Sequence, residues 1–170
     1  EAMKKWNKNF LIVARKLKGF HENMKKDDKD KYSYSPLKLK AEDDKDLEIL
    51  SKCLFEAICL DNEMKYLKDK NSFMMSVERF TWELGVNKDE EIFQVICIIE
   101  VKNIAKILTE KILTKSSKGI YSLLSIAYDK GFLMFTFEDQ AFIKINVNKL
   151  EVYVEDFGKP IKPPIVPSRK

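Results

Sequence analysis

The spacing of apolar residues changes at Gly131, and this change constrains the fold more than any other feature of the sequence. Before Gly131, apolar residues recur every three or four positions, as on one face of a helix; after it they recur at every second position, as on one face of a strand. The later pattern predicts three antiparallel strands over 132–137, 141–147 and 150–155, joined by a turn at 138–140 and a two-residue hairpin at Asn148 and Lys149.

The residues before Gly131 predict helices. Phe73, Val77, Phe80 and Leu84 have helical spacing, and Gly85 follows them where a helix commonly ends. The same reasoning predicts five helices, over residues 3–24, 42–66, 72–84, 87–113 and 117–130. The expected fold class is therefore α+β and mainly helical, with about five helices packed as a core and followed by a C-terminal three-stranded antiparallel β-meander.

Length and proline content indicate one domain with a tail. The chain has 170 residues, 45% of them hydrophobic, which suffices for one sizeable core. We expect a single domain over 1–158 and a proline-rich basic tail over 159–170. Residues 25–46 mix opposite charges without periodicity, so we expect a long solvated connection there.

Charge and cysteine content restrict the setting of the protein. The 31 basic and 27 acidic side chains leave a net charge of only +4, without the strong basic excess that phosphate-binding proteins carry. The three cysteines are an odd number within apolar stretches, which favours core thiols in a reducing compartment. No apolar run is long enough to span a bilayer. We therefore expect an intracellular, cytoplasmic protein with no transmembrane segment.

The sequence contains no recognisable catalytic, metal or cofactor motif. His21 is the only histidine, and the five glycines are isolated from one another, which excludes a glycine-rich phosphate loop. No pair of carboxylates can be assigned to acid–base chemistry from spacing alone. We expect a protein that is not an enzyme and binds no cofactor or metal.

The tail contains a pattern that suits recognition by an SH3-like domain. Pro164 and Pro167 are separated by two residues, and Arg169 follows two positions later. A polyproline II helix with this spacing fills two aromatic slots while its cation meets an acidic pocket. A stiff linker, or a strap on the domain's own surface, explains the same prolines.

The order of expected elements between Asn87 and Val154 resembles a winged helix-turn-helix, with the helix from Ser117 to Lys130 in the recognition position. Its polar face would consist of Lys115, Ser117, Lys118, Tyr121, Ser122 and Ser125. Glu138 and Asp139 at the expected wing tip oppose this interpretation because they would repel phosphate.

The leading functional hypothesis is a non-catalytic protein-interaction module, an adaptor or assembly protein. Its expected partner is another protein, contacted by helical surfaces such as the basic first helix, by the charged connection or by the proline-rich tail. The alternative is a winged-helix-like nucleic-acid-binding protein. An enzyme whose site is assembled from scattered carboxylates and serines is a third hypothesis.

Overall fold

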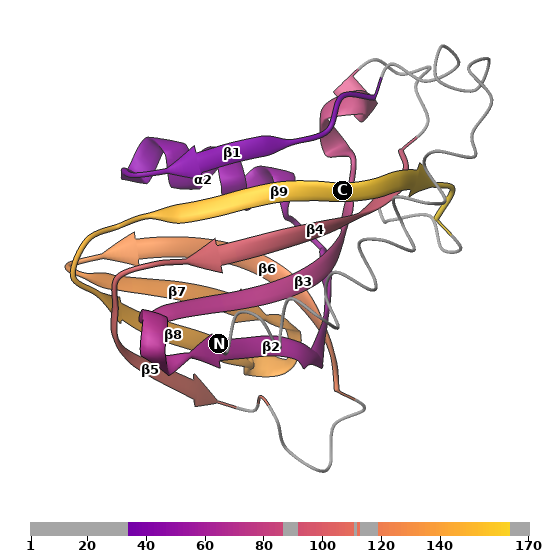
Figure 1. Ribbon diagram of the computed structural model, residues 1–170. Helices are drawn as coiled ribbons and strands as arrows, with labels where there is room; N and C mark the ends of the chain where they lie inside the picture. The colour runs from indigo at the N-terminus through magenta and orange to yellow at the C-terminus, as the bar shows by residue number, and fades with distance from the viewer. Residues whose placement is uncertain (1–33, 87–91, 111, 113–118, 164–170) are drawn as a thin grey trace.

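The computed structural model describes residues 34–86, 92–110, 112 and 119–163 (Figure 1). Most of these residues belong to one antiparallel sheet. Its nine strands are β1 (Lys38–Ala41), β2 (Ile58–Leu67), β3 (Ser72–Phe80), β4 (Gln94–Val101), β5 (Ile104–Glu110), β6 (Ile120–Asp129), β7 (Phe132–Phe137), β8 (Phe142–Val147) and β9 (Val152–Ile161). The described helices are α2 (Asp44–Cys53) and the short 3-10 helices η2 (Lys68–Lys70), η3 (Trp82–Val86) and η4 (Glu138–Gln140).

The strand order has an internal two-fold relationship. The order is β1-β9-β4-β3-β2-β6-β7-β8-β5, so β2 and β6 are adjacent at the centre of the last eight strands. On one side β2, β3 and β4 are followed by β9, and on the other β6, β7 and β8 are followed by β5. The strands thus form two sets of four in chain order, β2–β5 and β6–β9. The last strand of each set, β5 or β9, pairs with the other set.

The two connections that make this exchange lie together. The backbone N–H of Asn148 donates to the carbonyl of Asn103 at 2.9 Å, and that of Lys102 donates to Glu151 at 3.0 Å. β8 pairs with β7 and β5, whereas β9 pairs with β1 and β4. The hairpin predicted at Asn148 and Lys149 is therefore wrong, because these residues connect strands in different halves of the sheet.

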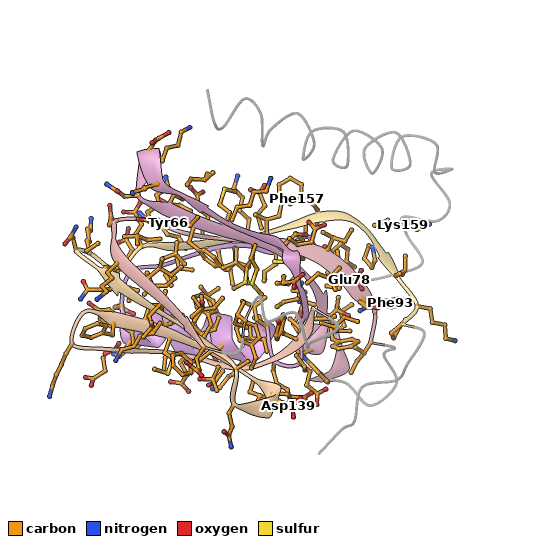
Figure 2. The ribbon with its side chains drawn as sticks, turned by 90° about the horizontal axis from the view of Figure 1, so that it is seen from below. Tyr66, Glu78, Phe93, Asp139, Phe157 and Lys159 are labelled. Atoms are coloured by element: carbon orange, nitrogen blue, oxygen red, sulfur yellow. The ribbon has the colours of Figure 1, made fainter. Side chains whose placement is uncertain are left out.

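The two halves of the sheet curve around a shared interior, which side chains fill (Figures 1 and 2). The most deeply buried apolar residues come from both halves and include Met75, Ile99, Leu133, Phe135 and Ile143. Burial of this apolar surface is the main favourable contribution to folding. The interior is a single core, to which buried residues of both halves of the sheet contribute.

Helix α2 packs against β1 and β6 and contributes to this core (Figure 1). Asp43 caps its first turn by accepting a hydrogen bond from the amide of Asp46 at 2.9 Å. Leu47 and Leu50 are buried, while Lys52 and Glu48 form an exposed ion pair at 2.8 Å. Only this part of the helix predicted over 42–66 is helical.

The predicted fold class is wrong, since the described chain is mainly antiparallel sheet. The other helices expected within the described residues are strands: 72–84 contains β3, 87–113 contains β4 and β5, and 117–130 contains β6. Residues 38–41 of the predicted connection form β1, and the helix predicted over 3–24 lies outside the described residues. The interpretation as a helical domain that uses helical surfaces is corrected accordingly.

The change of period at Gly131 does mark a real feature, a hairpin between β6 and β7. Lys130 and Gly131 both have positive φ, 46° and 85°, as in the tight turns that match strand twist. Strands occur over 132–137, 142–147 and 152–161. They do not form a three-stranded meander, however, because β9 pairs with β4 instead of β8.

Two phenylalanines on β7 test the assignment of its faces. Phe135 is 0% exposed and Phe132 is 39% exposed. We expect Phe135→Ala to lower the free energy of unfolding by about 3–5 kcal/mol, because it leaves a cavity in the shared core. Phe132→Ala should cost less than about 1 kcal/mol, because its side chain is partly exposed at the surface and its removal leaves no cavity in the core. Urea unfolding measures both, and equal losses would contradict the assignment.

Candidate functional site

The most distinctive group of side chains in the described structure surrounds a buried arginine. On β3 the residues Phe73 and Val77 face the interior at alternate positions, and Arg79 continues this series with 0% exposure. On β9 the buried series reaches Asp156, whose side chain is also 0% exposed. Strand β4 lies between them, with Cys97 directly opposite Asp156. Both charges therefore occupy core positions.

Arg79 uses all five of its N–H donors within the protein. Nε donates to Oδ1 of Asp156 and Nη2 to Oδ2, both at 2.7 Å. Nη1 and Nη2 donate to the two carboxylate oxygens of Glu83 at 2.9 and 2.8 Å, and Nη1 also donates to the carbonyl of Phe80 at 3.0 Å. A guanidinium has five donors, so none is left for a ligand.

Asp156 also holds the segment that leads into β1. The hydroxyl of Tyr34 and the backbone N–H of Leu37 both donate to Oδ2 of Asp156 at 2.8 Å. The amide of Asp156 itself donates to the carbonyl of Leu37 at 2.8 Å. The cluster of Tyr34, Arg79, Glu83 and Asp156, called the arginine cluster below, thus joins β3, η3, β9 and the start of the described chain.

The electrostatics of the arginine cluster favour its charged, closed form. Burial opposes the charge of Arg79, but hydrogen bonds and attraction from Asp156 and Glu83 outweigh this and raise the pKa of the guanidinium. Burial and the hydrogen bond to Asp156 raise the pKa of Tyr34, so its phenol stays protonated and donates. A buried charge that is this fully paired supports a structural role.

The cysteines near the arginine cluster have the wrong environment for a nucleophile. Burial, followed by the negative charge of Asp156, raises the pKa of the Cys97 thiol well above its ordinary value. Burial also raises the pKa of Cys59, and burial together with Glu83 raises that of Cys53. Reactive cysteines require the opposite shift, toward the thiolate. All three thiols are free.

Four exposed apolar residues lie on the neighbouring strands β2 and β6 or just before β2. Leu60 and Ile120 are opposite each other in register and are 37% and 59% exposed. Leu124, 39% exposed, lies farther along β6, and Phe55, 41% exposed, precedes β2. We call Phe55, Leu60, Ile120 and Leu124 the outer strip. These strands are at the centre of the sheet order, where the outer face is expected to be polar when it meets only water.

Trp82 connects the outer strip to the arginine cluster. Its indole N–H donates to the carbonyl of Phe55 at 2.7 Å, and its ring lies 6.0 Å from that of Phe55 and 5.6 Å from that of Phe80. The next residue, Glu83, is held by Arg79. Partly buried tryptophan with a fixed polar end is common at protein interfaces, because little side-chain entropy is lost on binding.

Within the described chain, acidic residues are next to outer-strip residues in sequence or, for Glu78, near them in strand register. Glu56 follows Phe55, Asp61 follows Leu60, and Glu78 is opposite Ile58 on the neighbouring strand. Glu78 accepts a hydrogen bond from the amide side chain of Gln94 at 3.0 Å. The described surroundings therefore favour a basic partner over an acidic one.

The residues predicted for a recognition helix do not form one. Tyr121 is buried in β6, with its ring 5.9 Å from that of Phe137, and Ser122 and Ser125 are half-buried on the same strand. The remaining residues of this set, Lys115, Ser117 and Lys118, lie outside the described residues. Because β6 occupies the place of the expected recognition helix, the winged-helix-like fold is wrong, while nucleic-acid binding itself stays a prediction.

The predicted contact residues of the tail, Pro164, Pro167 and Arg169, also lie outside the described residues. β9 continues to Ile161, which pairs with Gln94 on β4. Three residues of the segment that was predicted as tail therefore belong to the sheet. Recognition of the tail by an SH3-like domain stays a prediction.

Sequence reasoning missed the arginine cluster, although the sequence carries a signal for it. Along Phe73, Met75 and Val77 the next alternate position is Arg79, and along Val152 and Val154 it is Asp156. One basic and one acidic residue thus interrupt two apolar series. A strand interpretation of both segments would have predicted their pairing, because buried charges are almost always paired.

The fold and its cluster define a class: an antiparallel β-sheet domain of exchanged strands with an internal arginine–carboxylate pair. The model of a family described as "Protein of unknown function (DUF2948)" matches residues 37–169. The chain belongs to this family. No curated protein and no solved structure gives a significant match.

Two further properties concern the described part of the chain. It contains no helix that is long and apolar enough to span a membrane. Nor do its histidine, cysteine, aspartate and glutamate side chains come together in a group of three or more that could hold a metal ion.

Two neighbouring carboxyl groups on β9 test the arginine cluster. Asp156→Asn should lower the free energy of unfolding by about 3–5 kcal/mol. The new NH₂ group must face either Nε of Arg79 or the donors of Tyr34 and Leu37. Glu155→Gln, which removes only an exposed pair with Lys38 at 3.9 Å, should cost less than about 1 kcal/mol. Urea unfolding provides both values, and a loss below about 1 kcal/mol for Asp156→Asn would contradict a structural cluster.

Thiol labelling tests the environments of the cysteines. We expect Cys59 and Cys97 to resist a colorimetric thiol reagent in the folded protein at mildly alkaline pH, because both are buried and their raised pKa values suppress the thiolate. Cys53, which is half-buried, should react slowly, and all three should react after unfolding in guanidinium. Rapid labelling of Cys97 in the folded state would contradict this arrangement.

Proposed function

We propose that this protein is a non-catalytic protein-interaction module that binds its partner through the outer strip. The observation that carries the proposal is the exposed cross-strand pair of Leu60 and Ile120 at the centre of the sheet, together with the exposed Leu124 on the same strand as Ile120 and Phe55 just before β2. Single exposed apolar residues are ordinary, but neighbouring ones mark interaction surfaces more often.

The chemistry of the described residues supports a non-catalytic role. Arg79 has no remaining donor, and the nearby thiols are held in their protonated form. The arginine cluster instead fixes Glu83 and so places Trp82 beside Phe55. A rigid aromatic residue beside exposed apolar residues lowers the entropic cost of binding.

The surroundings of the outer strip define the kind of partner. A binding segment should place an apolar side chain over Leu60 and Ile120 and carry lysine or arginine at its flank, because the exposed Glu78 is opposite Ile58, which lies two residues before Leu60 on the same face of β2. We therefore propose a protein segment that is apolar with a basic flank, bound in an orientation that this carboxylate selects.

A phage-displayed library of random peptides tests this proposal without a known partner. The full chain should enrich peptides with an apolar core and a basic flank. Ile120→Asp should weaken their binding at least about tenfold, because it puts a charge at the centre of the strip. Ile49→Asp is the matched control, since Ile49 is 55% exposed on helix α2 and belongs to neither the outer strip nor β5, and the variant should leave peptide binding unchanged.

Several outcomes would reject the outer strip as the binding surface. These are the absence of any enriched peptide, enrichment of acidic peptides, or equal loss of binding in both variants. A chain that ends at Pro163 separates the proline-rich tail from the strip and keeps β9 intact. It should bind the selected peptides as the full chain does.

A further inference from the structure

Among the described strands, β5 is the last strand at one edge of the sheet. It is last in the strand order and, within the described part of the chain, pairs only with β8. Its side chains from Lys106 to Glu110 are exposed apart from the half-buried Ile107, and Leu108 is 54% exposed. An edge of this kind presents backbone N–H and C=O groups that another strand can pair with.

The opposite edge has the features that discourage such pairing. β1 has only four residues, and two of them are the exposed lysines Lys38 and Lys40. It also packs against α2. Short length, lysine side chains and cover by a helix are the usual protections of an edge strand. β5 is longer and has one lysine, whose charge is balanced by Glu110 on the same face.

The sequence of β5 is self-complementary when read in the opposite direction. Lys106, Leu108 and Glu110 lie on one face, opposite Asn146, Lys144 and Phe142 of β8. In an antiparallel pair of two β5 strands centred on Leu108, the lysine of each copy faces the glutamate of the other, and the two leucines meet. Opposite charges placed directly across an antiparallel pair are stabilising, and like charges are destabilising.

We propose that two copies of this protein associate by pairing their β5 strands in antiparallel orientation about Leu108. The pairing is isologous, so each contact between Lys106 and Glu110 occurs twice. The outer faces of β8 and β7 continue this surface, where Nζ of Lys144 lies 4.4 Å from the ring centre of Phe132. This association uses a different surface from the outer strip and goes beyond the function proposed above.

Charge exchange at the two positions provides a test that does not depend on knowing another partner. Lys106→Glu places glutamates opposite each other in the pair, and Glu110→Lys does the same with lysines. Each variant alone should dimerise at least about tenfold more weakly than the original chain, because two like-charge contacts replace two favourable ones. Sedimentation in the analytical ultracentrifuge measures the dissociation constants at low ionic strength.

Recovery of the dimer by complementary variants distinguishes a loss of strand pairing from a loss of folding. An equimolar mixture of the two single variants should form a heterodimer, because one chain presents only glutamate and the other only lysine. The double variant Lys106→Glu with Glu110→Lys should recover the homodimer. Ile120→Asp, on the outer strip, should dimerise as the original chain does, so failure of the peptide experiment and failure of this one are distinguishable.

Three results would overturn the proposal. The original chain could sediment as a monomer up to millimolar concentration. The single variants could dimerise as strongly as the original chain. The mixture of variants could fail to restore the dimer although each variant keeps the far-ultraviolet circular dichroism of a folded sheet.

Discussion

The ion pair of Arg79 and Asp156 is the constraint on which the rest of the structure depends. Neither charge could occupy a core position alone, because removing an unpaired ion from water costs several kcal/mol or more. Arg79 and Asp156 are 77 residues apart in sequence, so their pairing requires β3 and β9 to lie on either side of β4. Hydrogen bonds from Tyr34 and Leu37 to Asp156 attach the segment before β1 to this ion pair. The hydrogen bonds from Arg79 to Glu83 attach η3 to it.

The two halves of the sheet have the same pattern of strand pairing, but only one of them contains the arginine cluster. The interior side of the half formed by β6, β7 and β8 is apolar, with Leu133, Phe135 and Ile143 fully buried. The other half contains the charged cluster and carries Trp82 beside it. The exchange of β5 and β9 between the halves places β5 at one edge of the described sheet and the β2–β6 pair near its centre. The two surfaces proposed for binding follow from this topology.

Part of this fold can be predicted from the sequence, and the spacing of apolar residues explains why the rest cannot. Positions of strands after Gly131 could be predicted because their apolar residues alternate. On β6 a register irregularity between Leu123 and Ser125 places the buried residues Tyr121, Leu123 and Ile126 at mixed spacings of two and three, which imitates a helix. On β4 both faces are largely apolar, so periodicity cannot separate strand from helix. The outer strip could not be predicted, because it depends on the register of β2 with β6.

A double-mutant cycle over Arg79 and Asp156 tests the account most directly. The free energy of unfolding would be measured for Arg79→Met, Asp156→Leu and the double variant. We expect the double variant to be less destabilised than the sum of the single ones by about 2 kcal/mol or more. Arg79→Met leaves the buried carboxylate of Asp156 without its cation, and Asp156→Leu leaves Nε and one Nη2 donor of Arg79 without acceptors. A coupling below about 0.5 kcal/mol would show that the two side chains act independently and would contradict the account.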